Sequence, residues 1–167
     1  MSPAPPDFSS DLLAAARILI TGGSGFIGTN PVAAYRSAGL TVRNADMAQP
    51  RNAGDSDIWS CVDITRTEEV RALFSDFRPT HIFHLAARTD LGGSALGLAA
   101  NTTGVANLLT VLDEGTDPVD RVVIASSRLV CRIGYQPESD EDYCATTPYG
   151  ASKVETERLV RGTVDLP

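Results

Sequence analysis

The sequence predicts an α/β protein with a parallel sheet that is buried on both faces, and three observations lead to this prediction. Short runs rich in Val, Ile and Leu alternate with helical patterns along the chain. The first of these runs leads directly into a glycine-rich turn. No internal repeat, low-complexity tract or linker divides the sequence. Apolar strands that alternate with helices are typical of sheets with helices packed on both sides.

The expected elements follow one another regularly. The Pro-rich residues 1–16 are predicted to form a loose arm, and a single domain is predicted over 17–167. Strands are expected at 17–21, 40–45, 57–63, 81–87 and 121–127. Helices are expected from the glycine turn to about Ala38, over 67–77, over a long small-residue stretch that includes 101–115, and from Pro148–Tyr149 to about Arg161.

Pro31 conflicts with the first of these helices. A proline inside a helix removes a hydrogen bond and costs about 3 kcal/mol. We therefore expect either a kink at Pro31 or a helix that starts later than the glycine motif suggests.

Composition excludes several classes of function. The chain of 167 residues has 14 Lys and Arg against 21 Asp and Glu, a net charge of −7, and its basic residues do not cluster. This argues against nucleic acid and anionic membranes as partners. No apolar run approaches the roughly 20 residues that cross a bilayer, and the N-terminus lacks a signal-peptide pattern, so a cytoplasmic protein is expected. Cys61, Cys131 and Cys144 lack metal-ligand spacing, which favours reduced thiols and no metal site.

The stretch "ILITGGSGFIGTN" carries the first functional signal. Gly22, Gly25 and Gly28 fit the pattern T-G-x-x-G-x-x-G between a strand and a helix. Such glycines allow a tight turn, a close approach of the backbone to a pyrophosphate and close helix–strand packing. Free N–H groups at the helix start then bind phosphates. A glycine pattern alone is weak, but in this context it predicts a Rossmann-type doubly wound sheet that binds a dinucleotide.

Asp46 stands at the end of the second predicted strand. A carboxylate there accepts hydrogen bonds from an adenosine ribose and repels a 2′-phosphate, so NAD is favoured over NADP. Two alternatives stay open. Asp46 could merely cap the strand, and Arg43 or Arg51 could bind a phosphate, although neither occupies the strand end.

Tyr149 and Lys153 carry the second functional signal. Four residues apart on a helix, they share one face. A phenol is a poor base at neutral pH, but a neighbouring ammonium and a positive nicotinamide ring favour the phenolate. Such a tyrosine can exchange a proton with a sugar hydroxyl while hydride moves to or from the cofactor. Ser127, at the end of the fifth predicted strand, can hydrogen-bond the same oxygen.

These residues together resemble the extended short-chain dehydrogenase/reductase family over about residues 17–161. The most similar group is that of the NAD-dependent sugar-nucleotide epimerases and dehydratases. The resemblance makes "TGGSGFIG" the cofactor loop, with Phe26 and Ile27 supplying backbone amides, and makes Ser127, Tyr149 and Lys153 the catalytic residues. It implies further cofactor contacts from Asp63, Ile64, Leu85, Ala86, Ala87, Thr89, Asn101, Tyr149 and Lys153.

Members of this family run on for about as long again, through a smaller domain that grips the sugar nucleotide. We therefore expect an N-terminal portion, truncated before the C-terminal substrate domain. The resemblance implies an NAD-dependent epimerase or dehydratase that acts on a nucleotide sugar by transient hydride transfer. Two alternatives stay open: a noncatalytic NAD-binding module or inactive fragment, and a dehydrogenase or reductase of another alcohol or ketone.

The resemblance also implies a possible homodimer through the two long helices, at about 94–113 and 148–161. A sheet that ends after its fifth strand is expected to leave an edge and part of the core uncovered. Self-association or poor solubility is therefore expected.

Overall fold

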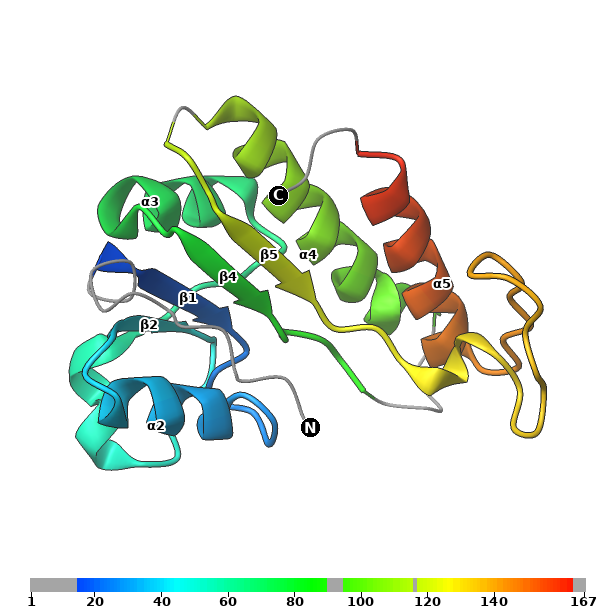
Figure 1. The fold of residues 1–167 in the computed structure, drawn as a ribbon, viewed down its shortest axis with the longest axis horizontal. Coiled ribbons are helices and arrows are strands. Elements are labelled where there is room, and N and C mark those ends of the chain that lie inside the picture. Colours follow the sequence, from blue (N-terminus) through cyan, green and yellow to red (C-terminus); the bar gives the residue numbers. More distant parts are fainter. Residues whose placement is uncertain (1–14, 90–94, 116, 164–167) are drawn as a thin grey trace, which may run out of the picture.

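A computed structural model describes residues 15–89, 95–115 and 117–163 of the chain. Its parallel sheet has five strands in the order β3-β2-β1-β4-β5 (Figure 1). The strands are β1 (Arg17–Thr21), β2 (Thr41–Ala45), β3 (Trp59–Ser60), β4 (His81–His84) and β5 (Arg121–Ile124). The chain moves outward from β1 to β3 and then crosses to the other side of β1, which creates a crevice at the carboxyl ends of β1 and β4. The predicted α/β, Rossmann-type fold is confirmed.

Helices cover both faces of the central strands (Figure 1). They are α2 (Thr29–Ser37), α3 (Thr67–Phe77), α4 (Ala95–Glu114) and α5 (Pro148–Arg161), with 3₁₀ helices η1 (Ala53–Ile58) and η2 (Arg128–Val130). Alternate side chains of β1 point to opposite faces. Leu19 packs in a cluster with Phe77 of α3 and Leu108 of α4, whereas Ile20 packs with Val32 of α2.

Strand β5 forms an edge of the sheet and is less buried than predicted. It pairs with β4 on one side only within the described residues. Val123, in register with Phe83 of β4, is 42% exposed. Burial on both faces therefore holds for the central strands and fails at β5. The expected uncovered edge is present.

Four predicted strands are longer than the observed ones, one of them, 40–45, by a single residue. The segment 57–63 contributes only Trp59–Ser60 to the sheet, because Asn52 caps a 3₁₀ helix that extends to Ile58; the Asn52 side chain accepts a hydrogen bond from the Gly54 N–H. Strand β4 ends at His84 rather than residue 87, and β5 ends at Ile124 rather than residue 127. Beyond those residues the chain leaves the sheet at its carboxyl edge.

Pro31 causes no conflict in the folded chain. Helix α2 begins at Thr29, so Pro31 is its third residue. The first four N–H groups of a helix have no intrahelical partner, so a proline there loses no hydrogen bond. The expected later helix start is not seen, since α2 follows Gly28 directly, and the cost of an interior proline does not apply.

The N-terminal boundary of the domain lies before Arg17. Ala16, which the sequence placed in the loose arm, is buried with β1 and β2 residues in the core. Residues 1–14 of the predicted arm lie outside the described residues. None of the helices in the described part of the chain has the length and apolar character needed to cross a membrane.

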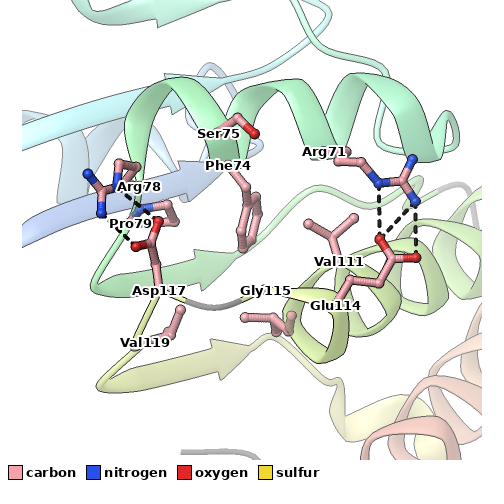
Figure 2. A pocket seen from close by; sticks show the side chains of 11 residues that line it. Arg71, Phe74, Ser75, Arg78, Pro79, Val111, Glu114, Gly115, Asp117 and Val119 are labelled. Carbon is pink, nitrogen blue, oxygen red and sulfur yellow. Dashed lines mark hydrogen bonds and ion pairs between the residues drawn. The ribbon is translucent and has the colours of Figure 1, made fainter.

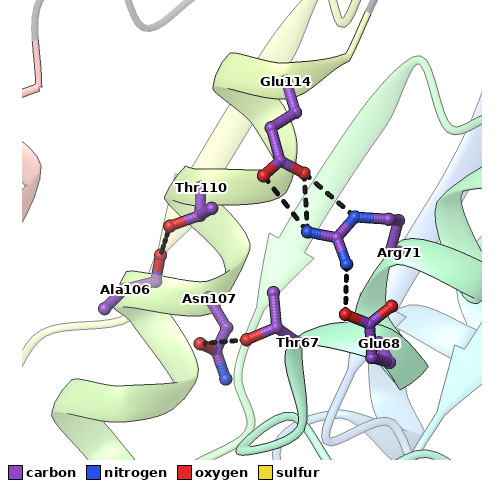
Figure 3. A network of polar contacts seen from close by, with 7 residues as sticks. All are labelled: Thr67, Glu68, Arg71, Ala106, Asn107, Thr110 and Glu114. Atoms are coloured by element: carbon purple, nitrogen blue, oxygen red, sulfur yellow. Dashed lines mark hydrogen bonds and ion pairs between the residues drawn. The ribbon is translucent and has the colours of Figure 1, made fainter.

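Helices α3 and α4 are joined by polar contacts that also position a loop (Figure 3). Arg71 bridges Glu114 at 2.8 Å and Glu68 at 2.7 Å. The Thr67 hydroxyl donates to Asn107 Oδ1 at 2.8 Å. The amide of the same asparagine donates to the Ile64 carbonyl oxygen at 3.0 Å, so this network holds the loop that precedes α3 against α4.

Candidate cofactor cleft and catalytic residues

A cleft of ≈ 630 Å³ lies at the carboxyl edge of the sheet, where the order of the strands reverses. Open α/β sheets bind their ligands at this position. Five parts of the chain contribute its walls: the glycine loop, the end of β2 with the residues after it, the loop before α3, the segment after β4, and helix α4. The lining residues are Gly22, Ser24, Gly25, Ala45, Asp46, Met47, Ala48, Arg51, Val62, Asp63, Ile64, Thr65, Leu85, Ala86, Ala87, Arg88 and Ala100.

The glycine loop depends on missing side chains at two positions. Gly22 has a φ of +71°, and a Cβ there would lie 2.6 Å from the Ala86 nitrogen. A Cβ on Gly28 would collide with the carbonyl oxygen of Gly22. The loop can therefore pass under the segment after β4 and lead directly into α2, as the motif predicts.

The loop leaves backbone donors free for an anion. Within the described residues, no hydrogen bond involves the N–H groups of Phe26, Ile27 or Gly28 as donors. Phe26 and Ile27 are 81% and 65% exposed, so this part of the loop is accessible to a ligand. Free N–H groups at the start of α2 suit a pyrophosphate.

Asp46 follows β2 directly and both lines the cleft and holds the glycine loop. Its Oδ2 accepts a hydrogen bond from the Ser24 N–H at 3.0 Å, and its Oδ1 accepts one from the Ala48 N–H at 2.9 Å. A carboxylate oxygen has two acceptor positions, so each can still receive a ribose hydroxyl.

The two arginines left open by the sequence point in different directions. Arg51 lines the cleft, where its Nε donates to the Ser24 carbonyl oxygen at 3.1 Å. Arg43 instead forms an ion pair with Asp76 at 2.9 Å, and its guanidinium group lies over the Phe77 ring. Only Arg51 of this pair is in a position to meet a cofactor phosphate.

Asp63 and Ile64 also line the cleft. Asp63 Oδ1 accepts hydrogen bonds from the Thr65 hydroxyl at 2.7 Å and the Thr65 N–H at 2.9 Å. Both bonds lower the pKa of Asp63, and the bond from the Thr65 hydroxyl has the larger effect. The carboxylate is therefore ionised and fixed in place at neutral pH.

The segment after β4 supplies Leu85, Ala86 and Ala87 to the cleft. Thr89 is exposed and does not line it. Asn101 is 2% exposed and lies behind the cleft, where it accepts from the Arg88 N–H at 2.7 Å and donates to Ser152 Oγ at 3.0 Å. It thus ties this segment to α5. Cofactor contacts from Thr89 and Asn101 stay predictions, as do those of the other predicted residues that do not line the cleft: Phe26, Ile27, Gly28, Tyr149 and Lys153.

Helix α5 presents the predicted catalytic pair. Thr147 caps it by accepting a hydrogen bond from the Gly150 N–H at 3.0 Å, and Pro148 lies in its first turn. Tyr149 and Lys153 are therefore one helical turn apart on the same face.

The Lys153 side chain crosses from α5 to the end of β5. It is 4% exposed, and its Nζ donates to the Ala125 carbonyl oxygen at 2.8 Å. Burial lowers the pKa of Lys153. Ser127 follows two residues later, and its Oγ accepts from the Leu129 N–H at 3.1 Å. The end of β5 and helix α5 thus carry all three predicted catalytic residues.

Several features of the site escaped the sequence analysis. Ser24 and Arg88 line the cleft but gave no separate signal. Lys153 was already indicated by its spacing from Tyr149, but a second signal for it was overlooked: it is the single lysine of the sequence, and every other strong base is an arginine. Arginine does not release its proton in proteins, whereas an amine can, so the one lysine marks a position where an amine is needed.

A second cavity, of ≈ 310 Å³, lies between the C-terminal ends of α3 and α4 (Figure 2). Helices that follow parallel strands end at the amino edge of the sheet, so this cavity is at the opposite edge from the cleft. Its two arginines are paired, Arg71 with Glu114 and Arg78 with Asp117. These ion pairs leave no free cation among the described residues that line the cavity, and we assign it to helix packing.

The sequence of residues 18–165 matches the profile of the NAD dependent epimerase/dehydratase family. Among curated proteins, the chain is 29% identical over 147 residues to dTDP-L-rhamnose 4-epimerase of Burkholderia thailandensis, covering 80% of this chain and 40% of that protein. It is 31% identical over 171 residues to 3-beta-hydroxysteroid dehydrogenase of Mycolicibacterium neoaurum, covering 94% of this chain and 45% of that protein.

Among solved structures, the chain is similar to the UDP-glucose 4-epimerase of Thermus thermophilus in complex with NAD. The TM-score is 0.73 and the identity 28%, over 87% of this chain and 50% of that one. The chain thus spans half or less of the length of these three proteins.

Proposed function

Because the chain belongs to the NAD dependent epimerase/dehydratase family, we propose that it is the cofactor-binding and catalytic part of an enzyme that epimerises or dehydrates a nucleotide sugar. NAD is the cofactor of the family. Two epimerases to which the chain is similar are named for a dTDP-sugar and a UDP-sugar. These names support a pyrimidine nucleoside diphosphate sugar as the substrate class.

The cleft has the groups that NAD requires. The free N–H groups of the glycine loop would hold its pyrophosphate, and Asp46 would accept the hydroxyls of its adenosine ribose. Asp63 and Ile64 would flank the adenine. When bound, NAD⁺ would accept a hydride from a sugar carbon and return it.

Proton transfer is the part of the reaction that this chain's own side chains perform. The phenolate of Tyr149 would take the proton from the sugar hydroxyl as the C–H bond gives up its hydride, and would return the proton when the hydride comes back. Lys153 would stabilise the phenolate with its positive charge. Ser127 would donate a hydrogen bond to the same substrate oxygen.

The observation that carries this proposal is the bond from Lys153 to the Ala125 carbonyl oxygen. It places a buried ammonium group between the helix that holds Tyr149 and the strand end that leads to Ser127. A lysine that served only solubility would be exposed, since lysine is almost never fully buried.

A second candidate function rests on the similarity to the 3-beta-hydroxysteroid dehydrogenase. The same Ser, Tyr and Lys can oxidise another secondary alcohol, with the hydride retained on the cofactor rather than returned. The substrate would then be a bulky apolar alcohol. Release of NADH in stoichiometric amounts distinguishes this reaction from epimerisation, which has no net redox change.

A homodimer through α4 and α5 belongs to the same proposal. The two helices pack against each other, joined by the hydrogen bond between Asn101 and Ser152. A second copy would extend this pair into a four-helix arrangement. Light scattering after size-exclusion chromatography would give twice the mass of one chain; the mass of one chain would contradict the dimer.

The proposed function is tested by incubating the chain with NAD and UDP- or dTDP-hexoses and identifying the products by NMR. Turnover in Tyr149→Phe should be about 10²–10⁴-fold below the rate of the wild-type chain, the range for general acid–base catalysis. Tyr35→Phe is the matched control, because Tyr35 lies on α2 and packs against Phe83. Bound NAD without turnover of any sugar or alcohol would favour a noncatalytic module.

A further inference from the structure

Two of the three cysteines lie side by side in the segment between Ser127 and Tyr149. Cys131 and Cys144 are partners in a parallel β-bridge that lies outside the five-stranded sheet. The Cys144 N–H donates to the Val130 carbonyl oxygen at 3.1 Å, which fixes the register of this bridge. Paired strands lie about 4.8 Å apart, and a disulfide joins Cα atoms about 4.4–6.8 Å apart. The backbone therefore meets the distance that a disulfide requires.

The sulfur atoms of the two cysteines are also directed toward each other's backbone. The Cys144 Sγ accepts a hydrogen bond at 3.4 Å from the N–H of Arg132, the residue next to Cys131. The Cys131 thiol donates at 3.4 Å to the carbonyl oxygen of Asp142, two residues before Cys144. Each sulfur thus lies against the backbone that carries the other cysteine.

The segment 131–144 is closed by contacts of its own. The Tyr135 hydroxyl donates to both carboxylate oxygens of Asp142 at 2.8 Å. The Glu138 N–H donates to Asp142 Oδ2 at 2.9 Å. Both cysteines of the bridge are free thiols in this structure. The fold therefore brings them together before any bond joins them.

The two thiols differ in exposure. Cys131 is 4% exposed, whereas Cys144 is half-buried. An oxidant from solvent therefore meets Cys144 first, and Cys131 meets it only through its neighbour. We propose that Cys131 and Cys144 form a reversible disulfide and are a redox-sensitive site between Ser127 and Tyr149.

The oxidising equivalents come from a small disulfide such as oxidised glutathione. The Cys144 thiolate attacks one of its sulfur atoms, which forms a mixed disulfide and releases one glutathione thiolate. Cys131 then gives up its proton and attacks Cys144 Sγ, which releases the second glutathione. Two protein thiols are thereby oxidised, and one glutathione disulfide is reduced to two glutathione thiols.

The disulfide closes a covalent loop between η2 and α5. Ser127 lies directly before η2, and Tyr149 is the second residue of α5. Oxidation thus restrains the segment that joins the two catalytic candidates, and reduction releases it. This consequence rests on the proposed function, whereas the disulfide itself does not.

Peptide mapping by mass spectrometry tests the pairing. Trypsin cleaves at Arg132, between the two cysteines, so they fall in the separate peptides 129–132 and 133–153. We expect these two peptides to be joined after the folded chain has been incubated with oxidised glutathione. Treatment with a reducing thiol should separate them again. Peptides that are never joined would overturn the proposal.

Single substitutions identify the role of each thiol. Cys61 is exposed, so Cys61→Ser is the matched control and should give the same joined peptides as the wild type. In Cys131→Ser, Cys144 should keep its glutathione adduct, because the second thiol is missing. A disulfide from Cys61 to either of the other cysteines as the main product would contradict the assigned pair.

The equilibrium with glutathione shows whether the fold pairs the thiols. In Cys61→Ser the disulfide should be favoured at least about tenfold more in the folded chain than in urea, about 30 mV in reduction potential. An equal equilibrium in the two states would overturn the proposal. Neither experiment needs cofactor or substrate. A chain that forms the disulfide but turns over no sugar would refute the proposed function and leave the redox-sensitive site intact.

Discussion

The Nζ of Lys153 donates a 2.8 Å hydrogen bond to the carbonyl oxygen of Ala125, the first residue after β5. This bond joins the helix that carries Tyr149 to the segment that leads to Ser127. Lys153 is buried, and removing a charge from water costs several kcal/mol. A side chain kept at such a cost is better explained by chemistry than by stability.

Lys153→Met separates these two explanations. Methionine is similar in length and apolar, so the lost hydrogen bond is offset by the removal of a buried charge. We expect the free energy of unfolding, measured with urea, to change by no more than about 1 kcal/mol, while turnover is lost. A destabilisation of about 3 kcal/mol or more would mean that Lys153 contributes mainly to the stability of the fold.

Gly22→Ala and Gly39→Ala form a matched pair for the cofactor loop. Both glycines have positive φ, +71° and +76°, so alanine introduces about 1 kcal/mol of backbone strain at each. Only at Gly22 would the new Cβ also meet the Ala86 backbone, since Gly39 has nothing within 4 Å.

Gly22→Ala should therefore lower the melting temperature more than Gly39→Ala. It should also weaken NAD binding, measured by calorimetry, by at least about tenfold, about 1.4 kcal/mol. Equal melting temperatures and equal affinities in the two variants would contradict the close contact between the loop and the segment after β4.

Acid should destabilise the protein through His84. Burial, and then the charge of Lys153, lower its pKa to about 4 in the folded chain, against 6.5 for an unperturbed histidine, so between these values the unfolded state binds the extra proton. Stability is thus highest above about pH 6.5 and is lost as the pH falls toward 4, by about 3 kcal/mol from this group. The free energy of unfolding in urea should differ less between pH 7 and pH 4.5 in His84→Gln than in the wild type. An equal difference in the two proteins would exclude His84 as the source of the acid destabilisation.

Val123→Lys should reduce self-association at the edge of the sheet. Val123 is 42% exposed on β5, and a lysine on an edge strand discourages pairing with another sheet. Light scattering should show fewer large species in this variant than in the wild type. Ile133→Lys is the control, since Ile133 is 94% exposed but lies outside the strands. An equal reduction of large species in both variants would mean that exposed hydrophobic residues in general, rather than the strand edge, cause the self-association.

Periodicity predicted the elements well where local pattern and tertiary packing agree. Helix α3 and helix α5 begin and end as the sequence indicates, because amphipathic spacing and the Thr147–Pro148 start are local signals. The ends of β4 and β5 were overestimated for a physical reason. Leu85, Ala86 and Ala87 continue the apolar run of β4 because they face the cleft, and not because they lie in the sheet.

The site was predictable where its residues lie close together in the sequence and hidden where they lie far apart. The glycine loop, Asp46 and the Tyr149–Lys153 pair have fixed spacings that a sequence reveals. The links from Thr21 to His84 and from Asn101 to Ser152 join residues 63 and 51 positions apart. Such contacts arise only when β1 meets β4 and α4 meets α5, so no local pattern announces them.

Calorimetric titration of the chain with NAD, and separately with NADP, tests the central claim most directly. We expect roughly micromolar binding of NAD, near −8 kcal/mol, and binding of NADP at least about tenfold weaker, because Asp46 repels a 2′-phosphate. In Asp46→Asn this difference should narrow. Absence of binding for both, or NADP binding as tight as NAD, would contradict the assignment of the cleft and of Asp46.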